Sequence, residues 1–319
     1  MPYIGRLGYM GLAKESAPGI VNATMDNWIA FNPPESITPT IKLLEHTGIA
    51  GKPDLIIKAN QGPGNIPSAK FNFNMEPENI GEVLMAAFGT DIKTGAGPDY
   101  IHTYSRLANA QLPTYSFFLD KGAAKPLYAG AMLNKLTIDA KAGDYVKADA
   151  DFVALRYDRE STGVPVYSTL KPFTFNEVAV NFAGSGVEVD YDNIKIEIDN
   201  MVKAEHALSS SIWPNKIYSE GFRVTIAADF FVENTTEYAK FLAGTNTSLV
   251  ITLTSSEIIP TTAVPYSLTF NLPVGKYSAA PYQLQAGVLK IPFSLVGIYD
   301  TSTTKTLNAI LVNGKSAAY

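Results

Sequence analysis

Alternating apolar and polar residues predict a β-strand at residues 69–75, and the same pattern returns at residues 224–230. In the first segment the apolar side chains fall on every second position, at Phe71, Phe73 and Met75. In the second segment they keep that phase, at Ile226, Ala228 and Phe230. A period of two is typical of a strand that buries one face, so each segment predicts a half-buried strand.

A helical period follows each of these strands. After the first strand, Pro77 suits the opening turn of a helix and Gly89 suits its end. The apolar stripe between them, spaced as on one face of a helix, is Ile80, Val83, Leu84 and Ala87. The second stripe, which ends at a glycine, is Thr235, Tyr238, Ala239, Leu242 and then Gly244. Each copy therefore predicts a strand, a tight turn and a short amphipathic helix.

The two copies lie 155 residues apart, from Ala69 to Val224, and this distance indicates a duplicated domain. Solenoid repeats have periods of about 20 to 50 residues, so the pattern does not fit a solenoid. The other apolar segments alternate as short strands bounded by glycine and proline, which predicts mostly antiparallel sheets. We therefore expect a mainly β protein with two tandem antiparallel β-sandwich or half-barrel domains, 1–160 and 161–319, each flanked by an α-helix.

Segments that interrupt the strand pattern predict the connections. A glycine-rich N-terminal arm precedes the first strands, and long loops are expected at 45–68 and 200–221. The charged, proline-bounded segment 156–172 predicts the domain junction. Downstream of the helices the match between the copies drifts, so that Pro113 in LPTYSFF is expected to correspond to Pro265 in VPYSLTF.

Composition limits the possible functions. The chain has 319 residues, a formal net charge of −5 and no cysteine. Its slight acidic excess, shared by both halves, does not suit a protein that holds nucleic acid through basic patches. The lack of cysteine excludes a disulfide framework and cysteine metal sites. No apolar run resembles a signal peptide or a membrane span, so no membrane partner is expected.

Candidate catalytic and metal-binding groups are sparse. The histidines His46, His102 and His206 are far apart in sequence. The favoured interpretation is that all three are surface residues at strand ends rather than metal ligands. The chain also has no phosphate-binding loop and no serine nucleophile elbow. The sequence therefore predicts a protein that is not an enzyme and that holds no metal and no cofactor.

Several short motifs resemble those of tail tube proteins from long-tailed bacteriophages with flexible, non-contractile tails of the siphovirus type. They are Gly11–Gly19 (GLAKESAPG) with Thr24, Ala86–Gly89 (AAFG), Leu112–Phe117 (LPTYSF), and Leu133, Leu136 and Ile138 followed by Gly143, Asp144 and Val146. The resemblance spans nearly the whole chain. It implies a β-sandwich flanked by a helix, whose subunits join strands into a ring, and rings that stack into a tube for viral DNA.

The resemblance also implies partners and a location. Other copies of the chain, a tape measure protein and a tail terminator would be its partners, and double-stranded DNA would pass through transiently. The protein would be made in the cytoplasm of the host bacterium and would reside in the virion tail. Because two tube folds are expected in one chain, three chains would form one pseudo-sixfold ring.

Acidic strand faces are the candidates for the wall of such a tube. The residues expected to face the lumen are Glu188, Asp190, Asp192, Glu197 and Asp199. About eight strands per chain and three chains give about 24 strands, a backbone diameter of about 48 Å and a bore of about 38 Å. A net acidic wall would repel the phosphates of a passing duplex. The long loops and the N-terminal arm would contact neighbouring rings.

Two other classes of protein remain as alternatives. The first is a carbohydrate-binding or adhesive β-sandwich protein of a virion or cell surface. The second is a glycosidase, because Glu188, Asp190 and Asp192 could supply a pair of carboxylates at the required separation. Three like charges on one strand are more typical of a solvated face, and the duplicated architecture favours a structural polymer.

Overall fold

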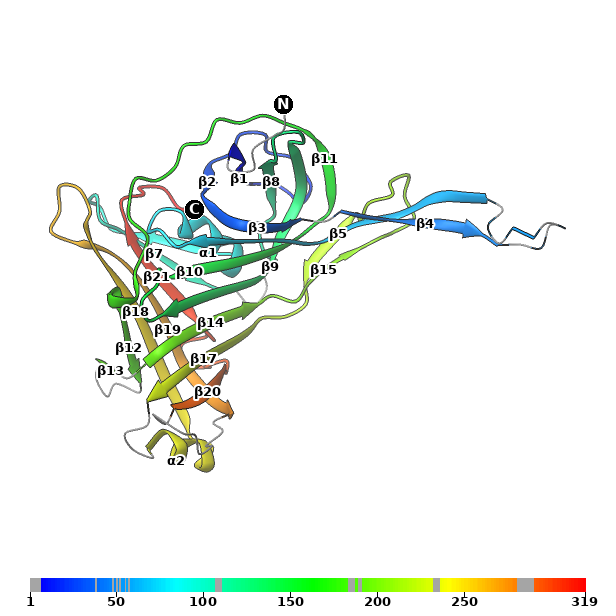
Figure 1. The fold of residues 1–319 in the computed structure, drawn as a ribbon. Helices are drawn as coiled ribbons and strands as arrows, with labels where there is room; N and C mark the ends of the chain where they lie inside the picture. Colours follow the sequence, from blue (N-terminus) through cyan, green and yellow to red (C-terminus); the bar gives the residue numbers. More distant parts are fainter. Residues whose placement is uncertain are drawn as a thin grey trace.

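The computed structural model describes residues 7–319 except for 38, 48, 50, 52, 55, 57, 107–110, 183–186, 189–190, 232–235 and 280–289. It confirms a mainly β fold built of antiparallel strands (Figure 1). The described part contains the α-helices α1 (Ile80–Phe88) and α2 (Thr236–Ala243) and the short 3-10 helix η2 (Phe175–Glu177). Both α-helices follow the strands that the sequence pattern predicts.

One long strand, β9, organises the first half of the chain by belonging to two sheets. The strands here are β1 (Tyr9–Lys14), β2 (Asn27–Ile29), β3 (Phe31–Ile37), β4 (Thr40–His46), β5 (Lys58–Asn74), β6 (Asp91–Thr94), β7 (Tyr100–Ser105), β8 (Tyr115–Asp120), β9 (Pro126–Lys141), β10 (Lys147–Ala154) and β11 (Arg156–Glu160). The N-terminal part of β9 lies in the order β2-β1-β8-β9-β11. Its C-terminal part lies in the order β3-β5-β10-β9.

The second half repeats this pairing scheme around β19. Its strands are β12 (Val178–Phe182), β13 (Val187–Glu188), β14 (Tyr191–Asp199), β15 (Val202–Glu205), β16 (Lys216–Ser219), β17 (Arg223–Phe231), β18 (Asn246–Ile258), β19 (Pro265–Ala279), β20 (Lys290–Gly297) and β21 (Asn308–Asn313). The N-terminal part of β19 lies in the order β12-β18-β19-β21, and its C-terminal part in the order β14-β17-β20-β19. Strands β14, β17, β20 and β19 therefore take the places of β3, β5, β10 and β9.

This scheme corrects one correspondence expected from the sequence. Pro265 opens β19, and β19 takes the place of β9, whereas Pro113 precedes β8. The place of β8 is taken by β18, because each is the strand paired with the N-terminal part of the central strand. The hairpin of β6 and β7 follows α1 and pairs with β21 of the second half. Because α2 is followed directly by β18, this hairpin changes the offset in residue number between equivalent strands of the two halves.

The two halves are joined by pairing between β9 and β14. Seven residue pairs are in register, from Asn193 opposite Lys141 to Asp199 opposite Lys135. A continuous sheet results, in the order β3-β5-β10-β9-β14-β17-β20-β19 (Figure 1). Most buried apolar residues of both halves form one cluster, which includes the apolar residues of α1, and a smaller cluster contains Leu112, Met132, Val153 and Val202. The division of the chain into domains at 160/161 stays a prediction.

The helix boundaries follow the signals in the sequence. Gly89 ends α1 with φ 86°, and its N–H donates to the carbonyl of Met85 at 2.8 Å. Gly244 follows α2 with φ 62°. Only glycine adopts this left-handed conformation without steric strain, so each glycine terminates its helix as predicted.

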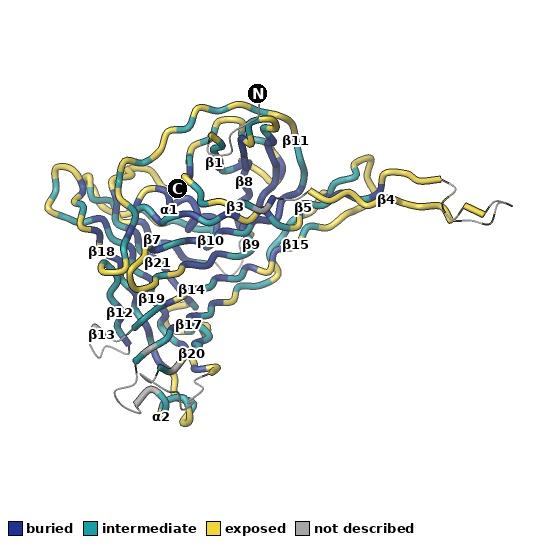
Figure 2. The backbone as a smooth tube through the Cα atoms, viewed as in Figure 1, coloured by how far each residue is buried: buried dark blue, intermediate teal, exposed yellow. Residues whose placement is uncertain are grey.

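Two segments predicted as long loops are hairpins instead. Residues 45–68 belong largely to the hairpin of β4 and β5, which projects from the body, and residues 200–221 contain the hairpin of β15 and β16 (Figure 1). Every residue of β4 is exposed, as the yellow trace in Figure 2 shows. The return strand of the first hairpin contains Gly62, Pro63, Gly64 and Pro67, which are more typical of a loop than of a strand, so the sequence pattern did not reveal the hairpin.

Candidate functional site

The eight-stranded sheet turns one face to the apolar core and the other to solvent. On β5, for example, Phe71 and Phe73 are buried, whereas Lys70, Asn72 and Asn74 between them are at least partly exposed. The same alternation holds on β10, β14 and β17 and, except at the buried Thr137, on the C-terminal part of β9. We call the solvent-facing side the polar face. It spans both halves of the chain without interruption at the β9–β14 junction.

A row of charges crosses the polar face at right angles to the strands, with alternating sign. The residues in register on β5, β10, β9, β14 and β17 are Lys70, Asp151, Lys135, Asp199 and Arg223. Side chains opposite each other on neighbouring strands have Cβ atoms about 4.5 to 5.5 Å apart. Each charge in the interior of this row therefore lies between two charges of opposite sign.

A second row of the same kind lies further along the strands. Asp139 on β9 lies opposite Lys147 on β10 and Lys195 on β14. Between the two rows, Asp149 has only uncharged residues opposite it, Asn72 and Thr137. The Asn72 amide donates to the Asp149 carboxylate at 3.0 Å.

Two ion pairs on this face involve residues that the sequence singled out. The Lys135 ammonium lies 2.8 Å from the Glu197 carboxylate, and the Lys290 ammonium lies 2.9 Å from the Asp192 carboxylate. The hydrogen bond and charge of Lys290 lower the pKa of the Asp192 carboxyl. Asp192 stays ionised in its pair, so it does not suit the proton-donating role that a glycosidase requires.

The predicted lumen residues are only partly brought together. Asp192, Glu197 and Asp199 lie on β14, where each is half-buried. Glu188 lies on the short strand β13, and its side chain is outside the described part of the structure, as is the whole of Asp190. The lysines and arginine opposite the acids were missed, because strand register decides which charges become neighbours.

The sheet has an open edge at each end. At one end, the described pairings of β3 are all with β5. Pro33 and Pro34 lie in β3, and proline in strands is confined to edges and bulges. At the other end, the described pairings of Tyr277 and Ala279 in β19 are all with β20. The corresponding part of β9 is covered by β14.

The projecting hairpin of β4 and β5, called the arm below, has an apolar surface and a supported base. Ile41, Leu43 and Leu44 are exposed by 46, 58 and 54%. At the base, Gly64 donates its N–H to the carbonyl of Ile212 at 2.8 Å. The ring of Trp213 packs so closely there that a Cβ on Gly64 would lie 2.8 Å from it.

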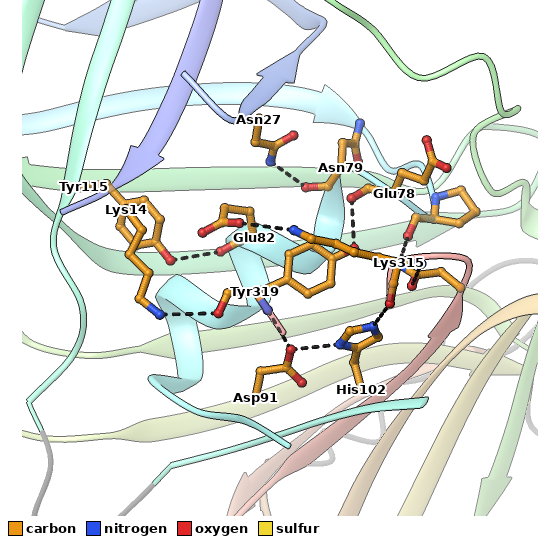
Figure 3. A network of polar contacts seen from close by, with 12 residues as sticks. Lys14, Asn27, Glu78, Asn79, Glu82, Asp91, His102, Tyr115, Lys315 and Tyr319 are labelled. Atoms are coloured by element: carbon orange, nitrogen blue, oxygen red, sulfur yellow. Dashed lines mark hydrogen bonds and ion pairs between the residues drawn. The ribbon is translucent and has the colours of Figure 1, made fainter. Parts of the chain in front are cut away.

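A buried polar network ties the C-terminal segment to α1 and β7 (Figure 3). The Asp91 carboxylate accepts the backbone N–H of Tyr319 at 2.9 Å and lies 2.8 Å from Nδ1 of His102. The Tyr319 hydroxyl is 2.7 Å from the Asn313 amide, and the Lys315 ammonium lies 3.5 Å from the centre of the Tyr319 ring.

The network corrects the prediction that all three histidines lie at the surface. His102 is fully buried, and its Nε2 atom lies 2.9 Å from the carbonyl oxygen of Lys315. His46 and His206 are exposed. Among the described residues no group of three histidine or acidic side chains is arranged to hold a metal ion. A cavity of about 560 Å³ adjoins the network, with Trp28, Tyr266 and Tyr319 among its lining residues.

Burial shifts the ionisation of the acidic and basic groups beside this cavity. Burial raises the pKa of Glu82, and burial lowers the pKa of Lys315. Their charged groups lie 3.8 Å apart, which limits both shifts. These groups anchor the C-terminal segment against α1. No helix in the described residues has the length and apolar character needed to span a membrane.

Comparison with known proteins gives one match. A family model described as phage tail tube protein matches residues 5–294, which is nearly the whole chain and covers both halves of the sheet. No curated protein matches the chain.

Proposed function

This chain belongs to the phage tail tube protein family, and from that premise we propose that three copies close into a ring and that the rings stack into the tube through which viral DNA leaves the capsid. Family membership gives it a structural role in the virion tail and self-assembly into a tube. It also favours that role over the adhesive and glycosidase alternatives. The ring stoichiometry, the DNA passage and the partners named below are the proposal.

The observation that supports ring closure is the junction between β9 and β14. Inside the chain, the C-terminal part of β9 pairs with β14. The C-terminal part of β19 and the strand β3 are the equivalent elements, and they lie at the two open ends of the sheet. We propose that β19 of one copy pairs with β3 of the next copy as β9 pairs with β14. Such a heterologous contact generates a closed ring when the rotation closes.

The number of strands supports three chains per ring. Each chain contributes the eight strands of the continuous sheet. Three chains give about 24 strands, for which the strand spacing and tilt imply a bore of about 38 Å. A DNA duplex is about 20 Å wide, which leaves a gap of about 9 Å on each side. In this arrangement the polar face, with Glu197 and Asp199, lines the bore.

The arm is proposed to make the contacts between stacked rings. It extends beyond the body of the molecule and exposes Ile41, Leu43 and Leu44, whose burial against another ring would be favourable. Its base is held by Gly64 and Trp213, so the arm is directed by the second half of the chain. By the same family analogy, a tape measure protein would occupy the bore before DNA does, a tail terminator would cap the tube, and synthesis would occur in the host cytoplasm.

Electron microscopy with cysteine cross-linking tests this function. Hollow tubes with threefold or pseudo-sixfold symmetry are expected from the purified protein. The natural chain has no cysteine, so Ser36→Cys with Ala279→Cys introduces thiols only on β3 and β19. By strand register these two residues are the counterparts of Glu197 and Thr137, which face each other across the β9–β14 junction. Oxidised rings of the double variant should run as covalent trimers on a non-reducing gel.

Matched variants decide between the outcomes. Ser36→Cys with Ser294→Cys moves one thiol inward to β20, beyond the reach of a disulfide across the edge. This pair should stay monomeric on the gel. Tubes whose edge cysteines never cross-link would exclude the proposed junction, and covalent hexamers would exclude three chains per ring. A chain with the arm replaced by a tight turn should form rings that do not stack.

A further inference from the structure

We infer that the polar face lets duplex DNA pass because its lysines are neutralised by carboxylates across the strands, and that a net acidic wall is not what prevents sticking. This inference rests on the proposed function, since it concerns the face that would line the bore. It assigns a role to particular cross-strand neighbours and names double-stranded DNA as the partner.

The polar face is close to charge balance among the described residues. Its basic residues are Lys70, Lys135, Lys141, Lys147, Lys195, Arg223, Lys276 and Lys290. Its acidic residues are Asp139, Asp149, Asp151, Asp192, Glu197, Asp199 and Asp229. Repulsion by net negative charge therefore cannot be what keeps DNA off this wall. The arrangement of the charges has to do it.

The alternating rows supply such an arrangement. Neighbouring strands are about 4.8 Å apart, and the sign of the charge alternates from strand to strand. Charges of the same sign therefore repeat about every 10 Å along a row. The fields of opposite charges cancel at distances beyond about one repeat. Salt screens what remains over about 8 Å at physiological ionic strength. A duplex centred in the bore, with a gap of about 9 Å to the wall, would experience almost no net attraction or repulsion.

Close contact is also made unfavourable by the same pairs. A phosphate that approaches Lys195 must compete with the carboxylate of Asp139, which lies opposite it, and one that approaches Lys147 must compete with the ion pair that this lysine forms with Asp144 as well as with Asp139 opposite it. Binding of DNA by lysine is driven by release of counterions from phosphate. A lysine that is already neutralised by a fixed carboxylate gains little from that exchange. The carboxylates act as permanent counterions, and their position next to lysine matters more than their number.

Two aspartates on neighbouring strands give a matched test. Asp139 lies between Lys147 and Lys195, whereas Asp149 lies between Asn72 and Thr137. Asp139→Asn and Asp149→Asn remove the same charge from the same face, but only the first removes a carboxylate that lies opposite lysine. Lys147 keeps its ion pair with Asp144, so Lys195 is the lysine that the first variant frees. Retention of a fluorescent DNA duplex of about 20 base pairs by sedimented tubes should rise about tenfold or more in Asp139→Asn at about 50 mM salt.

The salt dependence gives the second readout. Each lysine freed to contact phosphate should steepen the slope of log affinity against log salt by about 0.9, so Asp139→Asn, which frees Lys195, should steepen it by about 0.9. Asp149→Asn should leave both retention and slope near those of the natural protein. Equal retention by the two variants would overturn the inference in favour of net charge. Strong retention by the natural tubes would overturn it as well.

Other variants keep the test decisive. If Asp139→Asn fails to fold, Asp199→Asn repeats the test on the first row, where Arg223 loses the carboxylate opposite it while Lys135 keeps its ion pair with Glu197. Failure of the natural protein to form tubes would contradict the proposed function, not this inference. In that case the polar face is still exposed on the single chain, and binding of the duplex to unassembled Asp139→Asn and Asp149→Asn decides the question by the same comparison.

Discussion

The helices α1 and α2 follow equivalent strands, yet α1 is buried throughout, whereas α2 packs Tyr238 and Phe241 only partly against the core. Every residue of α1 is buried. In α2, Leu242 is 68% exposed, although it belongs to the apolar stripe that the sequence predicts. The second half of the chain covers part of α1. The ring of Phe222 lies 6.0 Å from that of Phe88, and the Asn200 amide donates to the carbonyl of Ala87 at 3.2 Å.

The difference shows what a junction between halves does to a helix. The first half has a neighbour beyond β9, and that neighbour supplies Phe222 and Asn200 to α1. The second half has no described neighbour beyond β19, so α2 lies at the end of the molecule (Figure 1). If the ring forms as proposed, the first half of the next copy supplies the missing cover. Folding of the single chain buries α1 completely and α2 in part, and assembly would complete the cover of α2.

The largest expected effect comes from truncating leucine on each helix. Leu84 is fully buried in α1, and Leu84→Ala should lower the free energy of unfolding by about 2 to 5 kcal/mol, because it removes apolar contacts and leaves a cavity. The same change at exposed Leu242 should stay within about 0.5 kcal/mol in the unassembled chain. Urea denaturation of the unassembled chain measures both. In tubes, Leu242→Ala should raise the concentration needed for assembly.

These leucines have the same chemistry, so only their surroundings differ. A large loss of stability for Leu242→Ala in the unassembled chain would mean that α2 is already part of the core. An assembly threshold that Leu242→Ala leaves unchanged would mean that the next copy does not cover α2.

Much of the local structure was predictable from the sequence. The alternation in 69–75 and the stripe of α1 identify elements that bury one face, and the structure confirms both. Gly89 and Gly244 end their helices as predicted. The arm escaped prediction as a hairpin because its return strand contains Gly62, Pro63, Gly64 and Pro67, residues that are typical of turns. Local pattern therefore fails where glycine and proline lie inside a strand.

The candidate site was less predictable, because it depends on contacts between segments distant in sequence. The sequence identified Glu197 and Asp199 as acids on one face of a strand. Their neighbour Lys135 lies on β9, and only the register between β9 and β14 places it beside them. Burial of His102 likewise depends on Asp91 and on the C-terminal segment at Lys315. Composition and periodicity contain no information on such pairings.

A smaller effect is expected at Gly81, where α1 accommodates Tyr319. A Cβ at this position would lie 2.1 Å from the tyrosine ring, so Gly81→Ala must displace the ring and its hydrogen bond with Asn313. We expect a loss of about 1 to 3 kcal/mol in the free energy of unfolding. The corresponding position in α2 is Thr236.

A double-mutant cycle identifies the cause of that loss. In a Tyr319→Ala background the ring is gone, and Gly81→Ala should then stabilise the chain by about 0.5 to 1 kcal/mol, because alanine favours a helix more than glycine does. Urea denaturation of the four variants gives the coupling energy. An equal loss in both backgrounds would show that Gly81 is needed for a reason other than Tyr319.

The smallest expected effect concerns Glu76, just before α1, whose counterpart before α2 is Phe231. Burial, and to a lesser degree the charge of Glu78, raise the pKa of Glu76 from 4.5 to about 7. The folded chain therefore favours the protonated carboxyl. The loss of stability caused by ionising Glu76 has its full size above about pH 7, decreases as the pH falls, and is absent below about pH 4.5. The shift alone corresponds to about 3 kcal/mol, and solvent access reduces the expected effect to about 1 kcal/mol.

Glu76→Gln should accordingly raise the free energy of unfolding by about 1 kcal/mol at pH 8 and leave it unchanged at about pH 4, since glutamine imitates the protonated acid. Urea denaturation at both pH values measures the difference, and Glu78→Gln serves as the control. This control removes only the smaller cause of the shift, so its effect at pH 8 should be weaker. A gain for Glu76→Gln that is equal at both pH values would show that the amide makes new contacts. The raised pKa of Glu76 would then not be what limits the stability of the chain at pH 8.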